Sequence, residues 1–168
     1  MTTYILALVC AAVCLVADQL TKVYIVNNVA LYSQNVFLDG LLNITYVQNG
    51  GGAWGILSGR TMFLVVVTVA IMFVCIYLLV VKAKNQPLYF WAVCLVLAGG
   101  LGNMIDRLFR GGLVVDFLQF DFWQDFPVFN IADCAIVIGC GLLILHFILD
   151  WIREKREKKV ATNANNNA

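Results

Sequence analysis

Charged residues are scarce in this chain, and no part of it is strongly basic or acidic. Asp, Glu, Lys and Arg together make up 12% of the 168 residues, 62% are hydrophobic, and the formal net charge is +1. Soluble domains carry about twice that share of charge, so the composition indicates an integral membrane protein. The near-zero net charge also argues against the basic surface that nucleic-acid binding requires.

Metal-ligand and cofactor signatures are missing as well. The sequence has a single histidine, His146, and its six cysteines form neither a CxxC pair nor a Cys/His ligand cluster. It also lacks a Walker-type glycine loop. We therefore expect no metal, no cofactor and no disulfide, with the cysteines acting as small, buried apolar residues. His146 precedes Asp150 by four residues and is expected to be packed or interfacial.

Long apolar runs are abundant, and they predict four membrane-spanning helices. Residues 62–81 form an uninterrupted apolar run, and twenty residues at about 1.5 Å each cross the roughly 30 Å of a bilayer's hydrocarbon core. The first run has no basic residue before it and continues into Asp18, so we expect it to be retained rather than cleaved as a secretory signal. The other spans are expected at about residues 4–26, 88–105 and 131–151.

The basic residues predict how these helices are oriented. Lys82 and Lys84 lie between the second and third runs, and five more basic residues follow the fourth run within 153–159. Short segments rich in Lys and Arg stay in the cytoplasm. Both termini are therefore predicted to be cytoplasmic, and the connections 27–61 and 106–130 are predicted to face outward.

A small β element is predicted in the first outer connection. Two runs of strand-forming residues flank Asp39-Gly40, a dipeptide typical of tight hairpin turns. The glycine-rich segment 49–57 carries an aromatic residue suited to the lipid interface and is expected to lie along the membrane. The fold class is therefore an all-α membrane protein with a small β element. We expect one domain over residues 1–160 and a disordered polar tail at 161–168.

Two aspartates, Asp116 and Asp133, stand in apolar stretches of the chain. A carboxylate in such surroundings is costly, so it indicates a functional site. The predicted topology brings six further polar residues to the same depth, where the outer ends of the helices would enclose a polar pocket. They are Asp18, Asn49, Asn103, Asp106, Arg107 and Asn130.

Most of these residues also have a purely structural interpretation. Helix capping and pairing between neighbouring turns would account for them without any catalysis. The local arrangements are Asn130 as the N-cap before Asp133, Asp18 paired with Lys22, and Asp106 paired with Arg107 or Arg110. Asp116 is different, because its apolar neighbours offer no local partner. It needs one from elsewhere in the fold.

If folding brings Asp116 and Asp133 together, two carboxylates in a dry site should share one proton, because they cannot both ionise readily. One would act as a base toward water, while the other polarises a carbonyl and later protonates the leaving amine. The helix dipole favours negative charge on Asp133, so we expect Asp116 to carry the proton. Such a pair would hydrolyse a peptide bond without a serine or a thiol.

Five motifs resemble, in order, those of the lipoprotein signal peptidases, the signal peptidase II family of bacterial membrane aspartic peptidases. They are Asp18-Gln-Leu-Thr-Lys22, Asn49-Gly-Gly-Gly-Ala-Trp-Gly55, Gly99-Gly-Leu-Gly-Asn-Met-Ile-Asp-Arg107, Val115-Asp-Phe117 and Phe129-Asn-Ile-Ala-Asp133. Trp54 stands where phenylalanine is more usual, and the third motif lacks the alanine that commonly follows its glycine pair. The resemblance covers the chain apart from its tail.

The resemblance implies four membrane-spanning helices, an extracytoplasmic β-cradle and a short interfacial helix, with Asp116 and Asp133 as the catalytic dyad. The implied substrate is a prolipoprotein with diacylglycerol on its lipobox cysteine, cleaved just before that cysteine at the bacterial cytoplasmic (inner) membrane. Membrane lipid is the other expected partner, and we expect a monomer that binds no nucleic acid. The residues implied to bind substrate or support the site are Asn49, Gly51, Asn103, Arg107, Asn130, Asp18, Lys22 and Asp106.

Two other functions fit part of the pattern. A small transporter or channel subunit could also have four helices and intramembrane acids, but it would place the acids near the bilayer middle. Here they cluster at one predicted face. A non-enzymatic assembly factor is the third candidate, and it would tolerate the loss of both aspartates.

Overall fold

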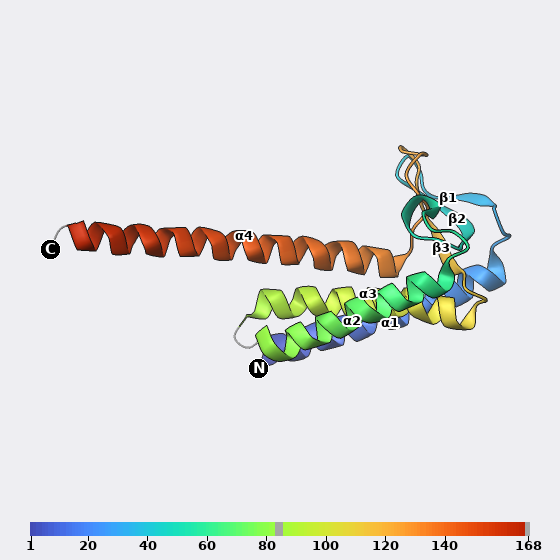
Figure 1. Cartoon of the computed structure of the whole chain (residues 1–168). Coiled ribbons are helices and arrows are strands. Elements are labelled where there is room, and N and C mark those ends of the chain that lie inside the picture. Colours follow the sequence, from blue (N-terminus) through green and yellow to red (C-terminus); the bar gives the residue numbers. More distant parts are fainter. Residues whose placement is uncertain (83–85, 167–168) are drawn as a thin grey trace.

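The computed structural model describes residues 1–82 and 86–166, which form a bundle of long helices with a small sheet at one end (Figure 1). The N-terminus and the C-terminal end of α4 lie at the end of the bundle opposite the sheet. The helices in this part that are long and apolar enough to span a membrane are α1 (Thr2–Asn28), α2 (Thr61–Lys82), α3 (Pro87–Phe109) and α4 (Ile131–Asn166). The predicted fold class is confirmed.

Helix α3 is the centre of the bundle, because it packs against α1, α2 and α4. Glycines allow its closest approach to α4. A Cβ on Gly99 would collide with the carbonyl oxygen of Ala132, and a Cβ on Gly139 would lie 2.7 Å from the carbonyl oxygen of Ala92. The interpretation of the Gly99 motif as a helix-packing motif is therefore confirmed at this position. Most side chains of α2 are exposed, as expected of a lipid-facing helix.

The described residues form one antiparallel sheet, with its strands in the order β1-β2-β3. The predicted hairpin is confirmed, since β1 and β2 are joined at Asp39-Gly40. Gly40 has a φ of 70°, which glycine adopts without steric cost. The strands are β1 (Gln34–Leu38), β2 (Leu42–Asn49) and β3 (Val114–Phe120).

Strand β3 lies in a segment that the sequence predicts only as an outer connection. It forms because Val115 and Phe117 are buried against Ile25 of α1 and Tyr46 of β2. Asp116 lies between these two apolar residues and opposite Val47 of β2. The strand therefore holds Asp116 on a rigid element rather than on a loop.

The glycine-rich segment after β2 contains a short helical turn, η1 (Ala53–Gly55). Trp54 in this turn is exposed and has a φ of 54°, which is unusual for a residue other than glycine. A short element is therefore present where the sequence predicts one. Its position along the membrane stays a prediction.

Helix α4 runs well past Trp151, where the sequence predicts the end of the fourth span. Residues 153–159 are all Arg, Glu or Lys, which are strong helix formers. The part of the expected disordered tail that is described, residues 161–166, continues this helix. Lys84 and residues 167–168 lie outside the described residues.

Candidate active site

Asp116 is 2% exposed and is held by neutral amide groups. Its Oδ2 accepts a hydrogen bond from Nδ2 of Asn49 at 2.9 Å, and its Oδ1 accepts one from Nδ2 of Asn130 at 2.6 Å. Burial, followed by the nearby charge of Asp133, raises the pKa of Asp116 to about 7 and outweighs these hydrogen bonds. The carboxyl group therefore retains its proton to near-neutral pH.

Asp133 lies in the first turn of α4 and forms a reciprocal cap with Asn130. Oδ1 of Asn130 accepts a hydrogen bond from the backbone N–H of Asp133 at 2.9 Å, and Oδ2 of Asp133 accepts one from the backbone N–H of Asn130 at 3.1 Å. This confirms the predicted capping arrangement. Because Asn130 also donates to Asp116, the same side chain joins the two aspartates.

Asn103 supplies the remaining hydrogen bond to the pair. Its Nδ2 donates to Oδ1 of Asp133 at 2.7 Å, while its Oδ1 accepts from Nζ of Lys22 and from Nδ2 of Asn130, both at 3.0 Å. A lysine ammonium group can only donate, so it holds the amide of Asn103 with its oxygen toward Lys22. The amide nitrogen is thereby directed at Asp133.

Asp116 and Asp133 line the same cavity, which has a volume of about 570 Å³. Three phenylalanines form part of its wall, of which only Phe129 belongs to one of the five motifs: Phe120, Phe126 and Phe129. Their ring centroids lie 5.0 to 5.9 Å apart. An apolar wall with a few converging polar groups is typical of a ligand-binding site.

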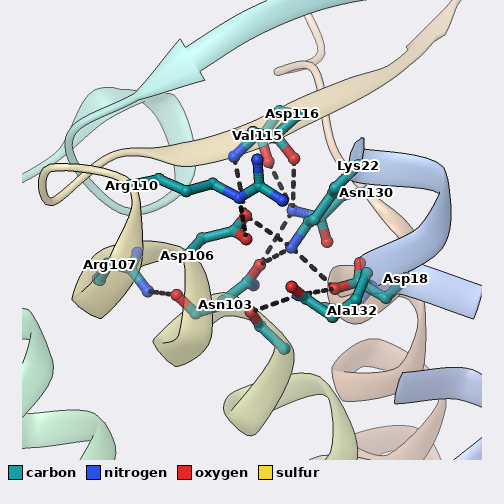
Figure 2. A network of polar contacts seen from close by, with 12 residues as sticks. Asp18, Lys22, Asn103, Asp106, Arg107, Arg110, Val115, Asp116, Asn130 and Ala132 are labelled. Atoms are coloured by element: carbon teal, nitrogen blue, oxygen red, sulfur yellow. Dashed lines mark hydrogen bonds and ion pairs between the residues drawn. The ribbon is translucent and has the colours of Figure 1, made fainter. Parts of the chain in front are cut away.

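A separate group of charges surrounds Lys22, which is fully buried (Figure 2). Nζ of Lys22 lies 2.9 Å from Oδ2 of Asp18 and 3.0 Å from Oδ2 of Asp106. The predicted pairing of Asp18 with Lys22 is confirmed, and Asp106 joins it from α3. We call these three residues, together with Arg110, the Lys22 cluster.

Asp106 pairs with Arg110 rather than with Arg107, which decides between the two alternatives left open by the sequence. Oδ1 of Asp106 lies 3.0 Å from Nε of Arg110, one helical turn away, and Oδ2 accepts the backbone N–H of Val115 at 3.0 Å. Adjacent positions on a helix point about 100° apart. Arg107 therefore lines the cavity of the two aspartates instead, and its Nη2 donates to the carbonyl oxygen of Gly51 at 2.9 Å.

Asp18 also holds the start of α4. Its Oδ1 accepts the backbone N–H of Ala132 at 2.9 Å, one of the N–H groups that a helix leaves unpaired in its first turn. Gln19 donates to Oδ2 of Asp18 and to the carbonyl oxygen of Gly102. The sequence did not predict the contact of Gln19 with Gly102 or that of Asp18 with the Ala132 backbone. These contacts join residues 83 and 114 positions apart.

Asn49 is oriented by the glycine-rich segment that follows it. Its Oδ1 accepts the backbone N–H of Gly51 at 2.9 Å, which leaves Nδ2 to donate to Asp116. A Cβ on Gly51 would lie 2.7 Å from the carbonyl oxygen of Ile56. Only glycine fits this position without a shift of the segment.

His146 is absent from the lining of this cavity, whereas Cys134 is part of it. Nε2 of His146 lies 3.2 Å from Oδ2 of Asp150, and its ring packs on Tyr89, so the prediction of a packed residue is confirmed. All six cysteines lie in the described part and are free, but only Cys75 and Cys94 are buried as predicted, while Cys140 is exposed and the other three are half-buried. Within residues 1–82 and 86–166, no group of three His, Cys, Asp or Glu side chains is placed to hold a metal ion.

Fold and site together define a class of protein. A bundle of membrane-spanning helices carries a cavity lined by two aspartates, and one of these has a pKa of about 7. A protonated and an ionised carboxyl group can together activate water and polarise a carbonyl. This arrangement is that of a membrane-embedded aspartic peptidase.

Comparison with known proteins gives the family. The model of the signal peptidase (SPase) II family matches residues 10–149. Lipoprotein signal peptidases of Enterococcus faecalis and Shouchella clausii are 41% and 43% identical to this chain, over 87% and 93% of it and 89% and 99% of their own lengths. A solved structure of a bacterial membrane enzyme has a TM-score of 0.82 and 36% identity, covering 89% of this chain and 90% of its own. This chain belongs to the signal peptidase II family and is a peptidase.

Proposed function

We propose that this peptidase removes the signal peptide from diacylglyceryl-modified prolipoproteins and cleaves just before the lipidated cysteine. The proposal depends on one observation above all: Asp116 and Asp133 line a single cavity and are joined through Asn130. The relatives named lipoprotein signal peptidase support the substrate class. They give no support to the alternative of a transporter or channel subunit.

In the proposed mechanism, Asp133 is the base and Asp116 is the acid. Asp133 accepts hydrogen bonds from Asn103 and from the backbone of Asn130 at the start of α4, where the helix dipole favours negative charge. It takes a proton from water as the water oxygen attacks the scissile carbonyl. Asp116 first polarises the carbonyl oxygen through its proton and later protonates the leaving amine. Its pKa of about 7 supports this role.

We assign the other polar residues supporting roles. Arg107 is placed to bind a substrate oxygen, because it lines the cavity and its buried Nε has no hydrogen-bond partner among the described residues. The amides of Asn49, Asn103 and Asn130 would orient the aspartates and the substrate backbone. The residues proposed to hold the shape of the site are Asp18, Lys22, Gly51 and Asp106.

We further propose that the site faces the outer side of the bacterial inner membrane, in a monomer with a single peptidase domain over residues 1–160. The basic segment 153–159 lies toward the end of the bundle that holds both termini, and basic segments favour the cytoplasm. The sheet and the aspartates would then lie at the outer boundary. A lipidated substrate would present its scissile bond there, because its acyl chains remain in the bilayer.

The test compares Asp116→Asn and Asp133→Asn with the wild type in detergent, following conversion of a diacylglyceryl prolipoprotein to its mature form. We expect each substitution to lower kcat by about 10³-fold, because each removes one half of the acid–base pair. Asp125→Asn is the matched control, since Asp125 is exposed in the same outer region. If either dyad variant is folded and retains a substantial fraction of the wild-type rate, the dyad assignment is wrong.

A further inference from the structure

A second cavity, of about 220 Å³, adjoins the catalytic cavity. Asn103, Arg107 and Ile136 line both cavities, so the two spaces share a wall. The proposed catalytic steps make no use of the second one. Its other lining residues come mainly from α2 and α3 and include Thr68, Met72, Cys75, Val96 and Leu97.

The lining of this α2–α3 cavity changes from polar to apolar along the bundle. Asn103 and Arg107 mark the end nearer the sheet, at the level of the aspartates. Val96 and Leu97 lie about two turns further along α3 toward the termini, and both pack against the apolar cluster that contains Cys75 of α2. The space therefore suits a ligand with a polar head at the catalytic level and an apolar tail deeper in the membrane.

Gly100 keeps the cavity open on the α3 side. A Cβ at this position would lie 3.9 Å from Cγ of Met72 and from Cγ2 of Thr68. That distance is an ordinary contact, so the backbone tolerates a side chain here. A longer side chain would extend into the cavity. Gly99 differs, because its Cβ would collide with the backbone of α4.

The proposed substrate has two apolar parts that must descend from the scissile bond into the membrane. The signal peptide is a helix, and a helix with its side chains is about 10–12 Å wide, so it needs a much broader space than a single acyl chain does. An acyl chain is only one methylene wide. The α4 side of the catalytic cavity instead offers an open apolar surface, where Val137 is 69% exposed and Ile138 is 56% exposed.

We propose that the α2–α3 cavity is an acyl-chain subsite, an inference that rests on the function proposed above. One acyl chain of the diacylglyceryl group enters this cavity, and the signal helix follows the exposed face of α4. Arg107 borders both spaces, so its guanidinium lies where the ester oxygens of the glyceryl group pass. Held in this way, the lipidated cysteine places the preceding peptide bond over Asp116 and Asp133.

The subsite positions the scissile bond more than it raises the affinity for the substrate. An acyl chain that leaves the bilayer for an apolar cavity gains little hydrophobic free energy, because lipid tails are as apolar as the cavity wall. Fixing the chain does orient the scissile bond relative to the dyad, and orientation lowers the barrier of a reaction. We therefore expect kcat/KM to depend on acyl-chain length.

The test uses the full-length enzyme in detergent and two lipobox peptides that differ only in their S-diacylglyceryl group, one with palmitoyl chains and one with butanoyl chains. Wild type should prefer the palmitoyl peptide. Gly100→Leu fills the cavity and should lower the ratio of the two kcat/KM values by about tenfold. Ala12→Leu is the control on α1, where the side chain is exposed and lines neither cavity, and it should keep the wild-type ratio.

A wild-type ratio in Gly100→Leu would overturn the subsite, while cleavage of both peptides by wild type would leave the proposed function intact. If wild type cleaves neither peptide, the proposed function fails and the subsite fails with it. A second measurement avoids any packing variant. A palmitoyl chain with a terminal diazirine, bound to Asp116→Asn and irradiated, should crosslink to α2 within residues 68–75. Crosslinks confined to α4 or to detergent would also overturn the proposal.

Discussion

The acids of the Lys22 cluster are as buried as Asp116 of the Asp116–Asp133 pair, but the two groups have opposite kinds of partner. Asp18 and Asp106 are 1% and 0% exposed, and Asp116 is 2% exposed. Each acid of the Lys22 cluster lies against at least one cation. Asp116 and Asp133 receive their side-chain hydrogen bonds from neutral amides. Burial alone therefore does not distinguish an acid that holds the fold from one that can exchange a proton.

The two groups also differ in what they border. The aspartate pair lines the cavity of about 570 Å³, whereas Asp18, Lys22 and Asp106 are absent from its lining among the described residues. The Lys22 cluster ties α1 to α3, to the start of α4 and to β3. Asn103 connects the two groups, because it accepts from Lys22 and donates to Asp133. The neutral side chain of Asn103 thus connects the Lys22 cluster to the aspartate pair and helps to fix the position of Asp133.

The largest effect should come from removing the cation of the Lys22 cluster. Lys22→Met leaves Asp18 buried without a cation and leaves Asp106 with Arg110 alone. We expect the free energy of unfolding to fall by about 3–5 kcal/mol, because an uncompensated buried charge remains. Denaturant unfolding in detergent measures this change, with Lys158→Met as an exposed control. An unchanged midpoint would show that the cation does not hold the cluster together.

The second-largest effect should appear when Asp18, which Lys22→Met leaves without a cation, is also neutralised. Adding Asp18→Asn to Lys22→Met should recover about 1–3 kcal/mol of the loss, since contacting charges couple by that amount. Adding Asp106→Asn instead should recover less, because Asp106 still has Arg110. Equal recovery by the two second substitutions would contradict this difference. The measurement is a double-mutant cycle on the unfolding free energy.

Asp116 and Asp133 should control how kcat/KM depends on pH. Ionisation of Asp116 removes the acid, so kcat/KM should decline as pH rises above about 7. The amide of Asn49 stabilises the ionised form of Asp116 and thereby lowers its pKa. Asn49→Leu removes this donor, so it should move the alkaline decline to higher pH. Asn35→Leu on the exposed strand β1 is the control, and an unmoved decline in Asn49→Leu would refute the assignment of Asp116 as the acid.

The raised pKa of Asp116 should also make the free energy of unfolding depend on pH. The ordinary pKa of an aspartate is 3.8, and that of Asp116 in the folded protein is about 7. Between these values the unfolded chain releases this proton while the folded protein keeps it, so the contribution of Asp116 to stability falls as pH rises from about 4 to about 7. Asp116→Asn should remove this contribution to the slope, which unfolding midpoints across the range can measure. Lys22→Met should keep this contribution and extend it to higher pH, because the charge of Lys22 lowers the pKa of Asp116.

The smallest effect should follow from removing the outer cation of the cluster. The side chain of Arg110 is 25% exposed, and Asp106 keeps Lys22 as its other partner. Arg110→Gln should therefore lower the free energy of unfolding by less than about 1 kcal/mol. A loss as large as that of Lys22→Met would mean that the two cations contribute equally, contrary to their difference in burial.

Local patterns explain most of what could be predicted about the site. The pair of Asp18 and Lys22 was predictable because the two residues are one helical turn apart, and the cap formed by Asn130 and Asp133 has a known spacing. Strand β3 was not predictable from its own residues, because it is stabilised by α1 and β2, which lie far away in the chain. The choice of Arg110 over Arg107 also required the structure. Both are near Asp106 in sequence, but only one faces it.

By itself, the sequence determined the four apolar spans, the hairpin at Asp39-Gly40 and the presence of two costly aspartates. Hydropathy, turn geometry and desolvation act over a few residues at a time, so these features can be read locally. Only the tertiary structure decided which acids pair with cations, which accept hydrogen bonds from amides and which line a cavity. Those outcomes depend on contacts between residues as far apart as 114 positions, and the free energy of a buried charge depends on the partner that folding brings to it.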